Sequence, residues 1–234
     1  MPFPPAMPLC RQAFAVLTIL FCALGSAFTS EALALAKSDI LLDIVSNCVD
    51  TASLNYCNVC RAPRSDAACA PARECGKSTE VWALNEQYTA IRDLKMCGCP
   101  AAFVHGLALP RKPVRGVEDP ARPDGIWQFA WDVASGRMNG ADIALVVNPR
   151  YRRSQDQLHV HLVRLDPGAR ERLAPHTVGT VRQLHEVWDV AARGALARSL
   201  DDYGVLVALD DGGSYRVVIT QESPESLFTL WRCD

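Results

Sequence analysis

Two histidines separated by one residue, His159 and His161, are the strongest candidates for chemistry in this chain. They belong to the segment Gln157-Leu158-His159-Val160-His161, in which polar and apolar residues alternate. Because side chains on a strand point alternately to its two faces, Gln157, His159 and His161 should project together, while the apolar residues anchor the strand in the core. Three roles fit such a pair: surface histidines, metal ligands, or a nucleophilic imidazole that attacks phosphorus. Metal binding would need a third ligand, and the local spacing offers none.

The loop before this strand favours the third role. It reads Asn148-Pro149-Arg150-Tyr151-Arg152-Arg153-Ser154-Gln155 and supplies three guanidinium groups, a hydroxyl and two amides. Guanidinium and amide donors stabilise the negative charge of phosphoryl oxygens. We therefore expect a phosphate-bearing ligand, and its predicted binding residues are Asn148, Arg150, Arg152, Arg153, Ser154 and Gln155. Taken alone, the arginine run would indicate a solvated turn.

The remaining histidines carry less information. His105 lies on a predicted strand, where it either occupies a polar niche or contributes to the same site. His176 follows Pro175 and is expected in an exposed loop. His185 lies in a predicted helix, where a surface position is commoner than a catalytic one.

The elements that position these residues follow from hydrophobic periodicity and turn residues. Alternating or apolar runs predict strands, and apolar residues at helical spacing predict helices. The predicted strands are 88–94, 101–109, 141–147, 158–165, 203–209 and 215–220, and the predicted helices are 38–46, 124–137 and 181–199. Asp124 is the expected N-cap of the second helix. Short turns between strand pairs, with helices between the pairs, predict a single α+β domain built on an antiparallel sheet with flanking helices.

The N-terminal residues have the composition of an export signal. Arg11 precedes an apolar run from Ala13 to Phe28, and small residues and Ala-x-Ala sites follow it. We expect residues 1–36 to be a signal peptide or a membrane anchor and residues 37–234 to form the domain. The formal net charge of the chain is -2, which argues against a nucleic-acid partner because such surfaces usually carry excess positive charge.

Eight of the ten cysteines lie beyond the predicted signal. An even number in an exported chain predicts disulfides, although their pairing cannot be deduced from the sequence. Cys57-x-x-Cys60 and Cys97-Gly98-Cys99 are also compatible with zinc or redox chemistry, but the chain lacks a well-spaced second CxxC pair. Residues 48–77 are therefore expected to be a Cys-rich, disulfide-stapled segment.

The stretch Asn148–Leu173, NPRYRRSQDQLHVHLVRLDPGARERL, resembles the signature region of bacterial CDP-diacylglycerol pyrophosphatases, a branch of the histidine-triad superfamily. The superfamily motif is His-φ-His-φ-His-φ-φ, with φ apolar and the central histidine as nucleophile. The resemblance makes His159 the nucleophile and His161 the last histidine, with His105 as an upstream histidine, Ser154 as a phosphate contact and Asn148 as a supporting residue. Gln157 departs from the motif in the first position, where an amide can support the site but cannot be protonated.

The resemblance implies a reaction and a location. His159 would attack the phosphorus on the nucleoside side of CDP-diacylglycerol, and water would hydrolyse the cytidylyl-histidine to CMP. No metal or other cofactor is implied. The expected partners are the nucleotide-linked phospholipid and a membrane surface, in the periplasm, with the N-terminal segment as an attachment to the inner membrane; the oligomeric state is left open.

Two other functions compete with this one. The chain could be a catalytically inactive exported binding module, in which the lost first histidine marks lost chemistry. It could also hydrolyse another nucleotide pyrophosphate.

Overall fold

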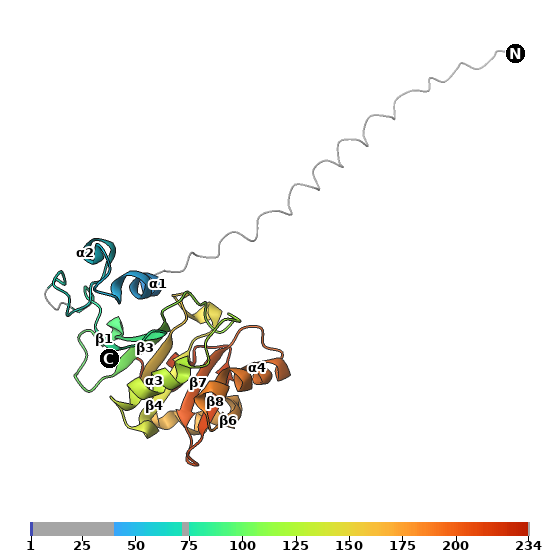
Figure 1. Cartoon of the computed structure of the whole chain (residues 1–234). Helices are drawn as coiled ribbons and strands as arrows, with labels where there is room; N and C mark the ends of the chain where they lie inside the picture. The colour runs from blue at the N-terminus through green and yellow to red at the C-terminus, as the bar shows by residue number, and fades with distance from the viewer. Residues whose placement is uncertain (2–39, 72–74, 234) are drawn as a thin grey trace. The chain divides into compact units, whose positions relative to one another are not determined.

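The computed structural model describes residues 1, 40–71 and 75–233, and an eight-stranded sheet runs through it (Figure 1). The strand order is β1-β2-β3-β5-β4-β7-β8-β6, and every neighbouring pair is antiparallel. The strands are β1 Val81–Leu84, β2 Tyr88–Arg92, β3 His105–Pro110, β4 Ile143–Val147, β5 Val160–Arg164, β6 Thr177–Val181, β7 Gly204–Leu209 and β8 Tyr215–Thr220. The sheet and its helices confirm the predicted α+β domain.

Helices and short helical turns connect the strands. The α-helices are α1 Ile40–Asp43, α2 Tyr56–Val59, α3 Ile126–Ser135, α4 Val187–Ala197 and α5 Pro224–Phe228. A π-helical turn, η1 Ile44–Cys48, continues α1, and the 3-10 turns are η2 Leu94–Met96, η3 Gly140–Asp142, η4 Arg150–Arg152, η5 Pro167–Ala169, η6 Glu171–His176 and η7 Leu184–Glu186.

One face of the sheet is covered by the two longest helices (Figure 1). Helix α3 contacts β3, β4 and β5, while α4 contacts β6 and β8. The core between them is apolar, and the indole rings of Trp127 and Trp188 pack there with centroids 4.7 Å apart. Leu158, Val160 and Leu162 point into this core, as the alternating pattern predicted. The polar residues of the same strand therefore lie on the opposite face.

The opposite face carries two smaller apolar clusters. In one of them, Leu41 and Ile44 from the N-terminal helical turns pack against Ile91, Leu107 and Leu109 of β2 and β3. The other gathers around β4, β7 and β8 and includes Phe228 of α5. Between these clusters the face is polar, and the histidines lie there.

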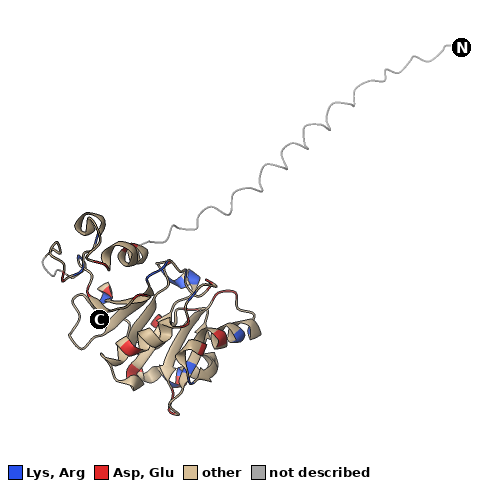
Figure 2. Ribbon diagram, viewed as in Figure 1, with Lys and Arg blue, Asp and Glu red and all other residues tan. Residues whose placement is uncertain are grey.

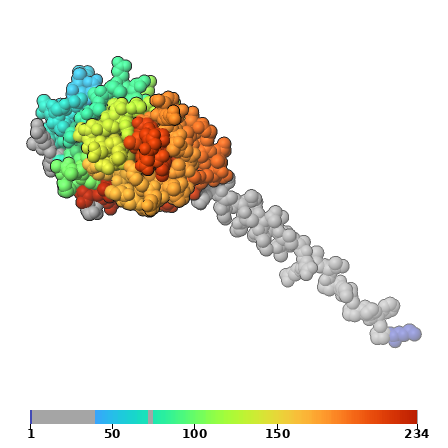
Figure 3. All heavy atoms as spheres, turned by 90° about the horizontal axis from the view of Figure 1, so that it is seen from below, coloured from blue at the N-terminus to red at the C-terminus, as the bar shows by residue number. Residues whose placement is uncertain are grey.

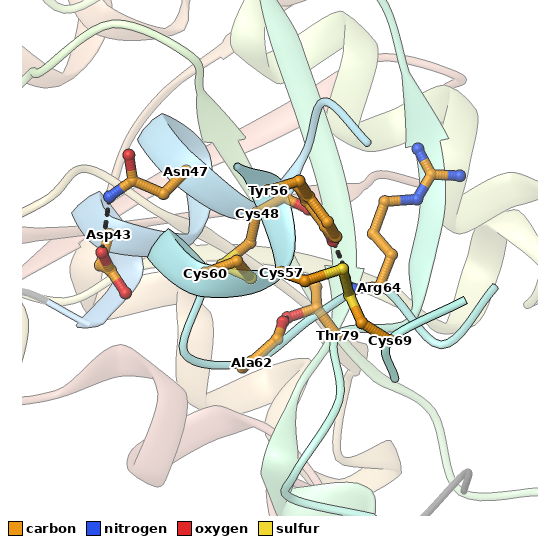
Figure 4. The surroundings of a disulfide bond; sticks show 10 residues. All are labelled: Asp43, Asn47, Cys48, Tyr56, Cys57, Cys60, Ala62, Arg64, Cys69 and Thr79. Atoms are coloured by element: carbon orange, nitrogen blue, oxygen red, sulfur yellow. Dashed lines mark hydrogen bonds between the residues drawn. A yellow bond between two sulfur atoms is a disulfide. The ribbon is translucent and has the colours of Figure 1, made fainter. Parts of the chain in front are cut away.

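Two interleaved disulfides shape the segment that precedes β1 (Figure 4). Cys48 is bonded to Cys60, and Cys57 to Cys69. The hydroxyl of Tyr56, drawn beside them, donates to the carbonyl of Cys48 and accepts from the backbone N–H of Arg64. These cross-links let a segment with little regular structure keep a defined shape, since they restrict its unfolded alternatives.

Two further disulfides connect distant parts of the chain. Cys75 is bonded to Cys97, and Cys99 to Cys233. The second bond spans 134 residues and ties the C-terminal segment to the turn after β2. Both Cys-x-x-Cys and Cys-Gly-Cys therefore serve structural disulfides, which confirms the disulfide prediction. Four disulfides are typical of an exported protein.

Several sequence-based boundaries are wrong. The helix predicted from Val181 begins at Val187, because Val181 pairs with Tyr215 as the last residue of β6. Asp124 does not cap α3, whose N-cap is Gly125. Strands β1 and β6 and helix α5 were not predicted. Each is short, and tertiary packing rather than periodicity decides such elements.

The predicted export signal, residues 1–36, lies almost wholly outside the described residues. Among the described residues, no helix has the length and apolar character needed to cross a bilayer.

Charged residues of both signs are scattered along the ribbon of the domain (Figure 2). The turn between β7 and β8 projects at one end of the sheet (Figure 1). In the view from below, a group of red atoms from the C-terminal part of the chain faces the viewer (Figure 3). Near the turn the rings of Trp131 and Tyr215 meet edge to face, with centroids 4.8 Å apart. The distribution of charge agrees with the near-neutral net charge of the sequence.

We predict that removing the Cys99–Cys233 bond costs more stability than removing Cys57–Cys69. The first closes a span of 134 residues and the second a span of 12. Because a longer closed loop removes more entropy from the unfolded chain, Cys99→Ser/Cys233→Ser should lower the free energy of unfolding by about 5 kcal/mol, against about 3 kcal/mol for the shorter loop. Urea unfolding of both double variants measures the difference. An equal or reversed order would contradict the prediction.

Candidate active site

Three of the five histidines lie on one face of the sheet. In the β3–β5 ladder, Leu107 is opposite His161 and His105 is opposite Val163, so His105 and His161 are diagonal neighbours. His159 precedes His161 by two residues, and their ring centroids are 4.9 Å apart. The pleat of β3 and β5 therefore places His105 and His161 together, opposite the helix-covered core, and His159, one residue before β5, lies beside His161.

A single hydrogen bond fixes the proton of His159. Its Nδ1 lies 2.7 Å from the backbone carbonyl oxygen of Gln157. A carbonyl only accepts hydrogen bonds, so Nδ1 carries the proton and Nε2 keeps its lone pair. Among the described residues, Nε2 forms no hydrogen bond. The side chain is only 7% exposed, but that remaining exposure faces a pocket that it lines.

The pocket has a volume of about 370 Å³ and lies between the sheet and the disulfide-stapled segment. Its apolar wall comes from Leu41 and Ile44 on one side and from Ile91 and Leu107 on the other. A hydrogen bond from the N–H of Leu41 to Oε1 of Gln155, 3.4 Å long, connects the N-terminal wall to the loop before the histidines. The wall can thus accept an uncharged part of a ligand.

Polar and cationic groups complete the lining. Ser154, Gln155, His159 and His161 line the pocket, together with Arg61, Arg92 and Lys95. Arg92 is paired with Glu80 at 3.0 Å. Within the described part of the chain, Arg61 forms no ion pair. A ligand that combines a negative charge with an apolar surface suits this lining.

The imidazoles of His105 and His161 are hydrogen bonded to each other. The distance from Nε2 of His105 to Nδ1 of His161 is 3.0 Å. Nδ1 of His105 lies 3.2 Å from the carbonyl oxygen of Trp231, so in the neutral ring it carries the proton and Nε2 accepts. His161 must therefore donate from Nδ1.

The amide of Asn148 supports this assignment. Its Nδ2 donates to Oε2 of Glu225 at 2.7 Å and lies 3.4 Å from Nε2 of His161. Its Oδ1 accepts from the hydroxyl of Ser223 at 2.8 Å. Since a carboxylate faces the amide nitrogen, the orientation of the amide is fixed and Nε2 of His161 must be an acceptor.

Charged groups surround the histidine pair. Oε1 of Glu225 lies 3.4 Å from Nε2 of His105 and 3.3 Å from Nδ1 of His161. The same oxygen accepts from Nζ of Lys95 at 2.5 Å. Oδ2 of Asp93 lies 3.5 Å from Nε2 of His105. Both carboxylates are largely buried.

The same group contains potential metal ligands. Asp93, His105 and His161 offer ligand atoms that all lie within 4.8 Å of one another. The ring nitrogens of the two histidines are, however, at hydrogen-bonding distance, and Lys95 occupies one oxygen of the neighbouring Glu225. We treat the group as a hydrogen-bonded cluster.

Burial keeps the histidines neutral. It lowers the pKa of His159 and, together with the neighbouring imidazoles, lowers the pKa of His161 well below the ordinary value of 6.5. Burial also lowers the pKa of His105, against the opposing effect of Asp93. A neutral imidazole has the lone pair that nucleophilic attack requires.

The side chain of Gln157 lies away from the pocket. Its Nε2 donates to the carbonyls of Pro110 and Lys112, each at 3.0 Å, and its Oε1 accepts from the N–H of Val114 at 3.2 Å. The amide therefore fastens the loop after β3 to the histidine strand. Its contribution at the pocket comes through its backbone carbonyl, which binds His159.

The three predicted arginines are not among the residues that line the pocket. Arg153 is buried and pairs with Glu118 and Asp156. Arg152 pairs with Glu222 at 2.7 Å and is exposed. The guanidinium of Arg150 lies over the ring of Tyr151. Their predicted role in phosphate binding is untested, whereas Ser154 and Gln155 do line the pocket beside His159.

Comparison with known proteins identifies the family of this chain. The family model of CDP-diacylglycerol pyrophosphatase matches residues 68–201, more than half of the chain. The chain belongs to that family. It is also 32% identical over 88 residues to a CDP-diacylglycerol pyrophosphatase of Yersinia pestis, a match that covers 33% of this chain and 34% of that protein. The chain thus spans about a third of the curated relative that it matches.

Sequence reasoning missed the charged residues of the site. Glu225 and the apolar wall from Ile40 to Ile44 both lie outside the residues that the family model matches. The Cys99–Cys233 disulfide brings the C-terminal segment to β2 and β3, but its pairing could not be deduced from the sequence and so did not point to Glu225. No spacing in the sequence marks Lys95 or Asp93.

The three hydrogen bonds of the Gln157 side chain lead to a stability prediction. In Gln157→Ala, the buried carbonyl of Pro110, the partly buried carbonyl of Lys112 and the buried N–H of Val114 lose this side-chain partner, so the free energy of unfolding should fall by about 1–3 kcal/mol. Gln128→Ala, on the exposed surface of α3, should change it by less than about 0.5 kcal/mol. Denaturant unfolding measures both. Equal effects in the two variants would show that the hydrogen bonds of Gln157 contribute nothing to the free energy of unfolding.

The lowered pKa of His159 leads to a second prediction. Protonation of the ring removes the attacking lone pair, so activity should fall on the acid side. Because burial lowers the pKa, the ring is still mostly neutral at pH 6.5, and the fall in kcat/KM should have its midpoint below pH 6.5. A profile of kcat/KM against pH tests this. A midpoint at or above pH 6.5 would be inconsistent with a buried, neutral nucleophile.

Proposed function

We propose that the chain hydrolyses the pyrophosphate bond of CDP-diacylglycerol and releases CMP and phosphatidate. Family membership supports the substrate. The observation that carries the chemistry is the hydrogen bond from Nδ1 of His159 to Gln157, which leaves Nε2 of a pocket-lining imidazole as a nucleophile.

In the first step, Nε2 of His159 attacks the phosphorus on the cytidine side. A nitrogen–phosphorus bond forms, the bridging oxygen–phosphorus bond breaks, and phosphatidate leaves with the electron pair. Phosphatidate is a stable anion, so its departure demands little proton donation. The product on the protein is a cytidylyl-histidine.

The negative charge on the non-bridging phosphoryl oxygens has to be stabilised by hydrogen-bond donors close to His159. Ser154, Gln155, Lys95 and Arg61 line the same pocket and supply hydroxyl, amide and cationic groups. His161 lines the pocket as well, but its Nε2 holds a lone pair and cannot donate to these oxygens. In this proposal, Asn148 and Gln157 position the histidines, while Arg153 fixes the loop between β4 and β5 through Glu118.

The proposed site also has to bind a substrate that is part of a lipid bilayer. Both acyl chains of the substrate reside in a bilayer, and a pocket of about 370 Å³ is suited to a head group rather than to two acyl chains. We propose that the pocket works at a membrane surface in the periplasm, to which the N-terminal segment delivers or attaches the domain. The four disulfides agree with an exported protein.

The central test is removal of the nucleophile. His159→Ala should reduce CMP release from CDP-diacylglycerol in detergent micelles by several orders of magnitude, because the covalent route is lost. His185→Ala, an exposed histidine in η7, should leave the rate unchanged. Unchanged CMP release in His159→Ala would refute the assignment of the nucleophile.

The substrate class needs its own measurement. Rates on CDP-diacylglycerol and on soluble nucleotide pyrophosphates should be compared with the same wild-type protein. A higher kcat/KM for the lipid supports the proposal. Equal or higher values for the soluble compounds would move the function to another nucleotide pyrophosphate, and no hydrolysis at all would favour an inactive binding module.

A further inference from the structure

Arg61 is a cation of the pocket that has no ionic partner in the described part of the chain. It lines the pocket together with Arg92 and Lys95. Arg92 is paired with Glu80 at 3.0 Å. Lys95 is paired with the buried Glu225. Arg61 is exposed, so the charge of its guanidinium remains available to an anionic ligand.

The backbone around Arg61 is fixed on both sides (Figure 4). Cys60, the preceding residue, is bonded to Cys48. The carbonyl of Ala62, the following residue, accepts a hydrogen bond from the hydroxyl of Thr79 at 2.8 Å. A disulfide and a hydrogen bond therefore hold the backbone of Arg61 at the pocket, while its long side chain can adapt to a ligand.

The location of Arg61 relative to the nucleophile determines which part of the substrate it can contact. The pocket lies between the sheet, which carries His159, and the disulfide-stapled segment, which carries Arg61. Displacement at phosphorus places the attacking atom and the leaving oxygen roughly in line. Attack by Nε2 of His159 therefore directs the leaving group away from the sheet, towards the side of the pocket that carries Arg61.

The leaving group of the proposed reaction is a phosphate that gains charge. In the first step, a bond forms between Nε2 of His159 and the cytidine-side phosphorus, and the bond from this phosphorus to the bridging oxygen breaks. The electron pair of the broken bond stays on the bridging oxygen, which becomes an oxygen of phosphatidate. The leaving phosphate thus gains one negative charge without taking up a proton, and a guanidinium can bind two of its oxygens at once.

The apolar residues of the lining suit the part of the substrate that follows this phosphate. Leu41 and Ile44, from the N-terminal helical turns, provide a buried apolar wall. Ile40 and Leu94 line the same pocket and are 48% and 56% exposed. In phosphatidate the phosphate is followed by glycerol and two acyl chains. These groups can leave the pocket past exposed apolar side chains.

We propose that Arg61 is a catalytic residue that binds the leaving phosphate of phosphatidate and stabilises the charge that this phosphate gains in the first step. This role rests on the proposed function and assigns the disulfide-stapled segment to the leaving-group half of the substrate. The family model begins at residue 68, so family membership does not assign this contact.

The role predicts that Arg61 matters only when the leaving group is a phosphate. Arg61→Gln should lower kcat/KM, which reports the first step, by roughly 100-fold for CDP-diacylglycerol and for the soluble ester CDP-glycerol, the scale of losing one donor to developing negative charge. Cytidine 5′-(4-nitrophenyl phosphate) offers His159 the same cytidine-side phosphorus but expels 4-nitrophenolate, which has no phosphate. Its kcat/KM, followed through the absorbance of the phenolate, should be unchanged in Arg61→Gln.

Two further variants separate the effect of the charge from an effect on folding. Arg61→Lys keeps a positive charge but loses the planar geometry that binds two oxygens, so its loss on CDP-diacylglycerol should be smaller than that of Arg61→Gln. Arg193→Gln removes an exposed arginine of α4, which covers the other face of the sheet. It should behave as the wild type on all three substrates. Normal hydrolysis of the nitrophenyl ester would show that Arg61→Gln is folded.

Product inhibition gives a second, independent readout. Phosphatidate with short acyl chains should bind at Arg61, whereas CMP should bind beside His159. In Arg61→Gln, the inhibition constant of the short-chain phosphatidate against CDP-glycerol hydrolysis should rise by roughly tenfold, because a hydrogen bond between charged groups is lost. The inhibition constant of CMP should stay the same.

The outcomes separate the role of Arg61 from the function on which it rests. A loss confined to the two pyrophosphates, with weaker binding of phosphatidate alone, supports the role. Equal losses on all three substrates, or no loss on any, overturn it and leave His159 as the nucleophile. If the wild type does not hydrolyse the nitrophenyl ester, the two inhibition constants decide. If the wild type does not hydrolyse CDP-diacylglycerol, the proposed function fails, and the role of Arg61 fails with it.

Discussion

The proposed chemistry of this domain depends on the hydrogen bond between Nδ1 of His159 and the carbonyl of Gln157. The acceptor is a backbone carbonyl two residues earlier, in the segment that leads into β5, so it cannot rotate away as a side chain could, and the backbone sets the tautomer of the ring. Core packing of Leu158 and Val160 holds that strand in place. The amide of Gln157 then ties the strand to the loop after β3. Reactivity of one nitrogen atom is thus a consequence of backbone geometry.

The pocket around that atom is assembled from segments that are far apart in the sequence. One wall belongs to residues before β1. The buried carboxylate Glu225, which contacts His105 and His161 but is not among the residues that line the pocket, follows β8. Neither segment has an extensive core of its own, and covalent cross-links compensate for that. The two interleaved disulfides keep the wall in shape (Figure 4), and Cys99–Cys233 keeps the C-terminal segment beside β2 and β3.

Local patterns in the sequence predicted the centre of the fold and of the site. The alternation at Leu158–His161 predicted which side chains face the core, and the structure confirms it. Turn residues and periodicity located most of β2, β3, β4, β5, β7 and β8. The same reasoning failed for Glu225 and Lys95, because their importance arises only when antiparallel pairing and a disulfide bring them to the histidines. It also could not show that Arg153 is held by Glu118, since ion pairing across a loop leaves no periodic signal.

The glutamine in the first motif position can be understood from the same geometry. Its side chain points to the carbonyls of Pro110 and Lys112, which require a donor, and to the N–H of Val114, which requires an acceptor. A primary amide satisfies all three, whereas one neutral imidazole has a single donor and a single acceptor. A histidine there would leave one of the three partners without its side-chain hydrogen bond. Protonatable groups are instead concentrated around His105 and His161, where two carboxylates and a lysine surround them. The loss of a histidine at position 157 is therefore compatible with an active site, because the structural task at that position calls for an amide.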